Sequence, residues 1–464
     1  MGAGALAVLL TGAALLAFWL SGDGLKQGVQ SRASQALGMD VVALGAVRLH
    51  LLPRPHIALA DVQIRHQGGK FMSVGQAMLG VDLLPLLSLG VQINRIDLLH
   101  VSISLEQQRD GRFNLETLTK PGATLEPVGI RTIVLSDTAL LYTDIHTGRS
   151  VAARACTMAL RDVQISGPTS APGAKRFSFS GELACQQLQS AGLVLEDLKS
   201  TVAANDGLVN FEPVTARAFG GQASGSLRAD FSSQVPVFRF QGGLANFQLA
   251  QAVQGLSPRS LGEGSMNFSA TLTLQGTSPQ EMRRSLSGEV ALSGHDLSLA
   301  IGDVDQAFSR YQASQSFNLV DVGAMFFAGP LGLVVTKGVS LASNLKESGG
   351  SSRVRTLVSL WHVEHGVAKA KDVAMATAEN RVALKGELDV DAGRFRNVTV
   401  ALLDAQGCAS VQQKISGTFE QPVIEKPNVL LTLSGPMRNL LSRTARALGT
   451  RCEVFYAGSV AAPG

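Results

Sequence analysis

The sequence predicts a mainly β protein with a single N-terminal transmembrane helix, one long curved antiparallel sheet and a few short helices. Three observations carry this prediction: an uncharged apolar run at the N-terminus, a hydrophobic period of two over much of the remainder, and many turn residues. Apolar residues make up 45% of the 464 residues and 49 are glycine, whereas aromatic residues make up only 5%. This mixture favours many strands joined by tight turns.

Residues 2–20 form the uncharged apolar run, which is just long enough to span a bilayer. A cleaved signal peptide is the competing interpretation. Phe18, Trp19 and Leu20 argue against it, because they are bulky where small residues normally precede cleavage. Trp19 also lies where an interfacial aromatic residue is expected. We therefore expect an uncleaved anchor, followed by a short helix over residues 21–37.

Three later segments alternate apolar and polar residues, which predicts strands with one apolar and one hydrated face. Pairs of turn residues, such as Gly220–Gly221 and Ala392–Gly393, separate such segments. Residues 248–256, 303–327 and 437–448 break this period and are expected to be helical. The apolar positions of the three strands are the candidate lining of a hydrophobic groove: Phe177, Phe179 and Leu183; Phe268, Leu272 and Leu274; and Val382, Leu384, Leu388 and Val390.

The four cysteines are Cys156, Cys185, Cys408 and Cys452. An even number in an exported chain permits two disulfides with three possible connectivities. Pairing of sequence neighbours is the simplest arrangement, and buried free thiols are the alternative. Because none of them has C-x-x-C spacing, a zinc or thioredoxin-like site is a poor interpretation.

The sequence offers no catalytic constellation, so we expect a non-enzymatic protein without metal or cofactor. It contains no G-x-S-x-G elbow, no Walker-type loop and no G-x-G-x-x-G after a strand. His362 and His365 are the nearest approach to a metal pair, but on a strand they point to opposite faces. The formal net charge of +4 is small for this length and argues against a nucleic-acid partner.

Several segments, taken in order, resemble the AsmA family of bacterial envelope proteins. Residues 51–64 (LLPRPHIALADVQI) are similar to its first hairpin, and residues 83–98 (LLPLLSLGVQINRIDL) to its short helix followed by a strand. Residues 110–115 (DGRFNL) and 219–225 (FGGQASG) resemble its turn motifs. Two final segments, 407–422 and 452–463, resemble the end of an AsmA-like C-terminal domain. The chain departs from the family pattern at Ser102 and Ile103, where many members carry proline, and at Leu115, which replaces an aromatic residue.

The resemblance implies a bacterial inner-membrane anchor, a body in the periplasm and a role in outer-membrane biogenesis. AsmA-like proteins are similar in architecture to chorein-type bridge proteins, which conduct phospholipids along a hydrophobic β-groove. The implied organisation is an anchor (1–20), an N-terminal AsmA-like β-groove region (21–245) and an AsmA-like C-terminal domain with helical insertions (246–464). The expected partners are membrane lipids, the inner membrane and other envelope proteins.

Two alternatives remain open from the sequence. A closed β-sandwich core shows the same alternation as an open trough. An assembly module that affects outer-membrane protein insertion without carrying lipid would also need no catalytic residue.

Overall fold

The computed structural model describes residues 26–28, 30–31, 33–34, 40–50, 52, 54–66, 69–82, 93–109, 128–166, 176–190, 192–254, 262–299, 305, 351–419, 421–425, 428–429 and 452–463. The chain divides into two compact units. Unit 1 comprises residues 1–216 and 228–234, and unit 2 comprises residues 217–227 and 235–464. The domain boundary predicted between residues 245 and 246 falls inside a strand of unit 2.

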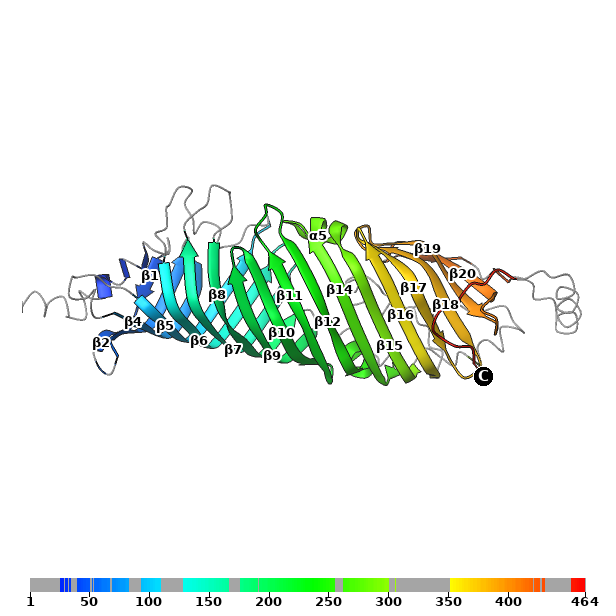
Figure 1. The fold of residues 1–464 in the computed structure, drawn as a ribbon, viewed down its shortest axis with the longest axis horizontal. Coiled ribbons are helices and arrows are strands. Elements are labelled where there is room, and N and C mark those ends of the chain that lie inside the picture. Colours follow the sequence, from blue (N-terminus) through cyan, green and yellow to red (C-terminus); the bar gives the residue numbers. More distant parts are fainter. Residues whose placement is uncertain are drawn as a thin grey trace, which may run out of the picture. The chain divides into compact units, whose positions relative to one another are not determined.

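Unit 1 is an open sheet, drawn from dark blue to green in Figure 1. The strands β10 and β11 (Gly221–Asp230) are divided between the two units. The described strands up to that point are β1 (Asp40–Ala43), β2 (Val47–His50), β3 (His56–His66), β4 (Gly69–Val81), β5 (Ile93–Gln107), β6 (Val128–Asp144), β7 (Arg149–Ser166), β8 (Arg176–Ser190), β9 (Leu193–Asn205) and β10 (Leu208–Ala218).

The strands of unit 1 pair in chain order. β1 and β2 both pair with β3, and β3, β4 and β5 follow as antiparallel neighbours. β5 and β6 are parallel, after which β6, β7, β8 and β9 are antiparallel again. The predicted antiparallel sheet is therefore confirmed, and β5–β6 is a parallel exception among the described pairs. Residues 108–127 separate the two strands, and a parallel pair needs a connection of about a dozen residues or more.

Unit 2 is a second run of antiparallel strands with two short helices. β12 pairs with β14, and β14 to β20 then pair in chain order. β13 adds to β15, while β21 and β22 add to β20. The elements are β12 (Val237–Gln248), α4 (Leu249–Gln254), β13 (Gly262–Glu263), β14 (Ser265–Gln275), α5 (Pro279–Ser285), β15 (Ser287–Leu299), β16 (Ser352–Glu364), β17 (Val367–Ala376), β18 (Arg381–Asp389), β19 (Arg394–Leu403), β20 (Ala409–Gly417), β21 (Pro422–Ile424) and β22 (Asn428–Val429).

The three alternating segments are confirmed as strands β8, β14 and β18. The helix predicted over residues 248–256 is α4, and the described residues between Lys26 and Ser34 are also helical. The helices predicted over 303–327 and 437–448 lie outside the described residues, apart from Asp305. The predicted anchor, residues 2–20, lies outside them too. Within the part of the chain that the structure describes, no helix is long and apolar enough to cross a membrane.

Residues with positive φ bend successive strands of unit 1 at one level. Asp61, His100, Asp137 and Asp197 have φ values of 49°, 54°, 49° and 50°. In the strand registers Asp61 lies level with Gly75, which is level with His100, which in turn is level with Asp137. A residue in this left-handed region turns the backbone of an otherwise extended strand. The sheet of unit 1 is therefore creased along this line.

Candidate functional site

The registers of unit 1 place apolar side chains from successive strands in rows on one face of the sheet. Directly paired residues lie on the same face, so the rows follow from the pairing. We call these rows the apolar face of unit 1. From β4 to β8 they are Leu79, Ile96, Ile133 and Leu160; Ala77, Leu98, Leu135, Met158 and Leu183; Val74, Val101, Thr138, Cys156 and Cys185; and Met72, Ile103, Leu140, Ala153 and Leu188.

The row at the crease is buried, whereas most side chains of the rows on either side are half-buried. Val101 and Cys156 in the crease are 1% and 6% exposed. Ile133, Leu135 and Leu140 beside it are half-buried. Among the described residues, therefore, no second layer packs fully over these flanking rows, and the arrangement is a trough with a closed floor and partly open walls.

The crease is apolar apart from one hydroxyl group. Thr138 is 7% exposed, and its Oγ1 has no hydrogen-bond partner among the described residues. The disulfide between Cys156 and Cys185 joins two directly paired residues in the same row, with a Cα–Cα distance of 4.0 Å. It therefore fixes the register of β7 and β8 at the crease. Cys408 is likewise bonded to Cys452, so both bridges join sequence neighbours.

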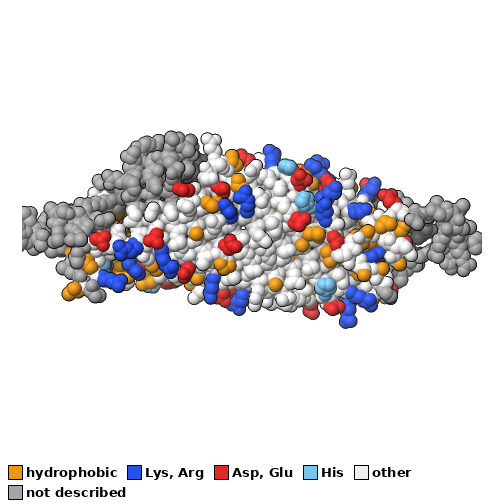
Figure 2. All heavy atoms as spheres, in the orientation of Figure 1, with side chains coloured by type: hydrophobic (Ala, Val, Ile, Leu, Met, Phe, Trp, Pro, Cys, Tyr) orange, Lys and Arg blue, Asp and Glu red, His pale blue; other side chains and the backbone are white. Residues whose placement is uncertain are grey.

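The opposite face of unit 1 carries the charged side chains. Arg95 Nε lies 2.6 Å from Asp97 Oδ2, and Arg161 pairs with Glu182 at 3.4 Å across β7 and β8. Figure 2 shows Lys and Arg interspersed with Asp and Glu over the visible face, without one large block of a single sign. The two faces of this sheet thus differ strongly in polarity.

A hollow of about 400 Å³ lies over β4 to β7. Ser73, Ser102 and Ala139, which line it, are paired in register on the face opposite the apolar rows. Leu141 beside them is 46% exposed. Ile103, Leu140 and Ala153 of the apolar rows also line it, so the hollow shares part of its lining with the trough.

In unit 2 the corresponding face is a filled core rather than an open wall. Leu272 is level with Gly288, then with Val363, Ala368 and Leu388, so the predicted positions of β14 and β18 share one face. The side chains that close it are almost fully buried: Leu297, Val354, Leu357, Trp361, Val363, Val373, Met375, Val398 and Val400.

The ten predicted groove residues therefore lie in two different environments. Phe179 and Leu183 are half-buried in unit 1, and Phe268, Leu272 and Leu274 are half-buried in unit 2. The side chain of Phe177 lies outside the described residues. By contrast Val382, Leu384, Leu388 and Val390 are 1%, 2%, 2% and 8% exposed within the core. Lipid contact at any of the ten stays a prediction.

The period-of-two pattern does not identify the half-buried apolar residues of β5, β6 and β7 as a groove wall. Residues 133–135 are Ile, Val and Leu, so apolar side chains on both faces hide the alternation. The bulge at Asp137 then shifts the inward positions from odd to even numbers, as at Leu135 and Leu140. A strict period of two cannot detect a wall that changes phase within one strand.

Part of the other face of unit 2, over β17 to β19, is covered by residues 452–463, which we call the C-terminal strap. Tyr456 and Val460 of the strap pack on a bed of small side chains that includes Ala374, Ala383 and Ala401. The Tyr456 hydroxyl donates a hydrogen bond to Asp372. Burial, together with this bond, raises the pKa of Tyr456 to about 12. The small side chains allow the strap to lie close against the sheet.

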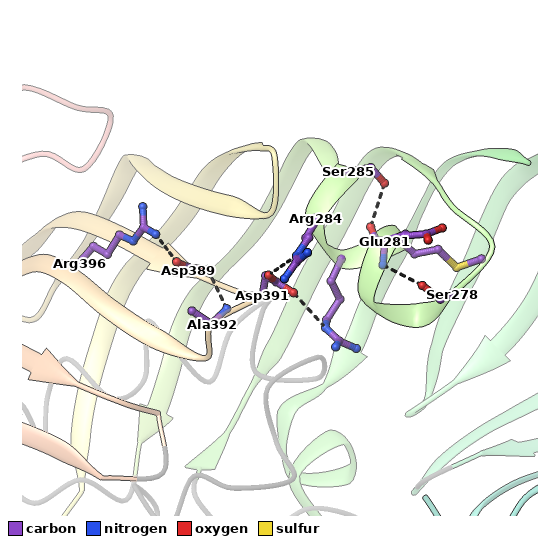
Figure 3. Close-up of polar contacts among 10 residues, drawn as sticks. Ser278, Glu281, Arg284, Ser285, Asp389, Asp391, Ala392 and Arg396 are labelled. Carbon is purple, nitrogen blue, oxygen red and sulfur yellow. Dashed lines mark hydrogen bonds and ion pairs between the residues drawn. The ribbon is translucent and has the colours of Figure 1, made fainter. Parts of the chain in front are cut away.

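One rim of unit 2 is joined by polar contacts between neighbouring hairpin ends (Figure 3). Ser278 caps α5 by accepting a hydrogen bond from the backbone N–H of Glu281. Arg284 of α5 reaches Asp391 in the β18–β19 turn, with 2.9 Å between Nε and Oδ2. Asp389, which is 5% exposed, pairs with Arg396 and accepts from the backbone N–H of Ala392.

The histidines and carboxylates of the described residues do not gather into a metal site. Among those residues, no group of three or more His, Cys, Asp or Glu side chains is placed to hold an ion. His362 lies on β16 beside Glu289, and His365 lies in the turn that follows, with its side chain 82% exposed.

The comparisons with known proteins agree with this picture. No curated protein and no solved structure matches the chain. The profile of the AsmA family matches residues 2–155 and 180–318, which together make up more than half of the chain. The chain therefore belongs to the AsmA family.

Proposed function

We propose that this protein is an inner-membrane-anchored component of the bacterial envelope that binds or conducts lipids through the trough of unit 1, in outer-membrane biogenesis. One observation carries the proposal: apolar side chains of successive strands stand in register on one face, and most of those beside the crease are only half-buried. Membership of the AsmA family supports the envelope role. The anchor would be residues 2–20, and the body would lie in the periplasm.

An open apolar wall lowers the main barrier to lipid movement between two membranes. Exposure of an acyl chain to water costs about 0.8 kcal/mol per methylene, so two chains of ordinary length cost on the order of 20 kcal/mol. Rows such as Ile133–Leu160 and Leu135–Met158 would cover the chains while the headgroup stays in water. This role requires no catalytic residue.

The test compares two substitutions on the same strand that differ only in the face they change. Leu135→Asp places a carboxylate in the apolar wall of β6, and Leu141→Asp places one on the opposite face. The detergent-purified full chain and both variants would be extracted, and bound lipids identified by mass spectrometry. We expect the unmodified chain and Leu141→Asp to retain phospholipid, and Leu135→Asp to lose most of it.

Thermal unfolding of each variant shows whether the fold survives, since a charge beside the crease also affects stability. Equal lipid retention by a folded Leu135→Asp variant would contradict binding at this face. A folded, unmodified chain that carries no lipid would favour the alternative function, an assembly module acting on outer-membrane proteins without lipid.

A further inference from the structure

The helical residues before β1 run alongside the edge strand of unit 1. Lys26 Nζ and Gln30 Nε2 donate to the backbone oxygens of Gly45 and Ala43, each at 3.3 Å. The hydroxyl of Ser34 accepts from the backbone N–H of Val41 at 3.0 Å. As the residue number rises along the helix, the partner number falls along the strand, so the two run antiparallel. The first described helical residue, Lys26, therefore lies next to the β1–β2 junction, and the chain enters the helix from the β2 side of the edge strand.

The hairpin between β2 and β3 lies at that same end of the edge strand. At its tip Leu52 is 85% exposed, the largest exposed fraction among the exposed large apolar side chains described. Arg48 and Arg54 beside it are exposed, and neither forms a described ion pair. The rings of His50 and His56 stack at 4.8 Å across the base of the hairpin. The tip thus combines one protruding apolar side chain with flanking basic groups on a braced base.

The lengths of chain involved place this tip within reach of the membrane surface. Residues 21–25 connect the predicted anchor to Lys26 and extend at most roughly 21 Å. From Gly45, which Lys26 contacts, to Leu52 the strand and turn cover about 23 Å. The tip lies on the side from which the chain enters the helix at Lys26. A leucine between arginines is suited to a bilayer interface, where the side chain enters the acyl layer and the guanidinium groups meet phosphates.

We propose that the β2–β3 hairpin tip docks on the membrane surface at which the predicted anchor ends. Leu52 enters the acyl region, and Arg48 and Arg54 contact anionic phospholipid headgroups. This contact would hold the edge of unit 1 against the bilayer. It is separate from lipid binding in the trough, because no residue of the tip belongs to the apolar face defined above.

The test places an environment-sensitive fluorophore on a cysteine at the tip. The full chain with Leu52→Cys would be reconstituted into vesicles of phosphatidylethanolamine and phosphatidylglycerol that carry quenchers on their acyl chains. The four native cysteines are paired in disulfides and should not be labelled. Leu141→Cys is the control, because this residue of unit 1 is 46% exposed.

We expect blue-shifted emission and strong quenching at position 52, and neither at position 141. Equal quenching at the two positions would overturn the proposal. A blue shift without quenching would indicate burial against a protein and would also overturn it. Quenching at position 52 should weaken when Arg48→Glu and Arg54→Glu are added. It should also weaken in vesicles of phosphatidylcholine, which lack anionic headgroups. Unchanged quenching would refute the role of anionic headgroups. Because lipid co-purification is measured separately, failure here leaves the proposed function of the trough intact.

Discussion

At the residue scale, the most informative feature is a polar residue with positive φ that bends a strand just before a buried side chain. Asp61, His100, Asp137, Asn246 and Asp296 all have positive φ. The next residue is buried in every case: Val62, Val101, Thr138, Phe247 and Leu297. Asp and Asn adopt this conformation more readily than most residues other than glycine. A polar residue that turns the backbone thus directs the following side chain into the core or crease.

Asp296 offers a direct test of this role, because its φ is 50° and Leu297 after it is fully buried. Asp296→Val should lower the free energy of unfolding by about 1–2 kcal/mol, since a β-branched residue is strained at positive φ. Asp296→Gly should change it little. Ser298→Val, at an exposed position of the same strand, is the control and should be neutral. Urea denaturation measures all three, and equal effects of valine at 296 and 298 would refute the conformational argument.

At the element scale, hydrogen bonds and ion pairs hold neighbouring hairpin ends of unit 2 together. Their contribution to the free energy of unfolding depends on how deeply they are buried. Asp389 and Asp391 stand two residues apart at the end of β18 (Figure 3). The Asp389 side chain is 6% exposed, whereas both arginines that reach Asp391 are about half exposed. The alternation of β18 predicts both carboxylates on the hydrated face. Asp389 is instead buried, and it can be, because its carboxylate pairs with Arg396 and accepts a hydrogen bond from the Ala392 N–H.

Alanine substitutions at these two positions should therefore differ. Asp389→Ala should cost about 2 kcal/mol, because it removes a charge-assisted bond and leaves the Ala392 N–H without its acceptor. Asp391→Ala should cost less than about 1 kcal/mol, and added salt should remove most of that effect, since its partners are solvated. Denaturation at low and high salt measures both. Equal costs would show that burial does not decide the strength of these links.

The C-terminal strap is a second element whose docking has a predictable dependence on pH. Tyr456 has its pKa raised from the ordinary value of 10.0 to about 12. A raised pKa means that the protonated side chain is favoured by folding, so this contribution is complete below pH 10 and is lost as the pH rises towards 12. Phenolate absorbance of the native chain minus that of Tyr456→Phe should show a midpoint near pH 12. A midpoint near 10 would mean that the strap is not docked as described.

At the scale of the whole molecule, the sequence predicts the type of architecture better than the location of the open surface. Alternation in β8, β14 and β18 identifies strands because the period of two is local. The parallel pairing of β5 and β6 depends on a long connection that carries no local signal. Whether a face is open or filled depends on which side chains cover it, as the contrast between Leu135 and Leu384 shows. Both are leucines on apolar strand faces, and only the latter lies in a closed core.

This contrast leads to a prediction that separates lipid binding from folding. Leu183→Asp changes a half-buried wall position of unit 1, whereas Leu384→Asp puts a carboxylate at a core position that is 2% exposed. The core variant should lose about 4 kcal/mol or more of stability, because an unpaired buried charge replaces packed apolar contacts. The wall variant should stay folded and lose bound lipid. Limited proteolysis and lipid analysis of the two full-length variants measure these outcomes. A folded Leu384→Asp variant that has lost its lipid would instead move the binding surface to unit 2, and would show that the core there opens to admit an acyl chain.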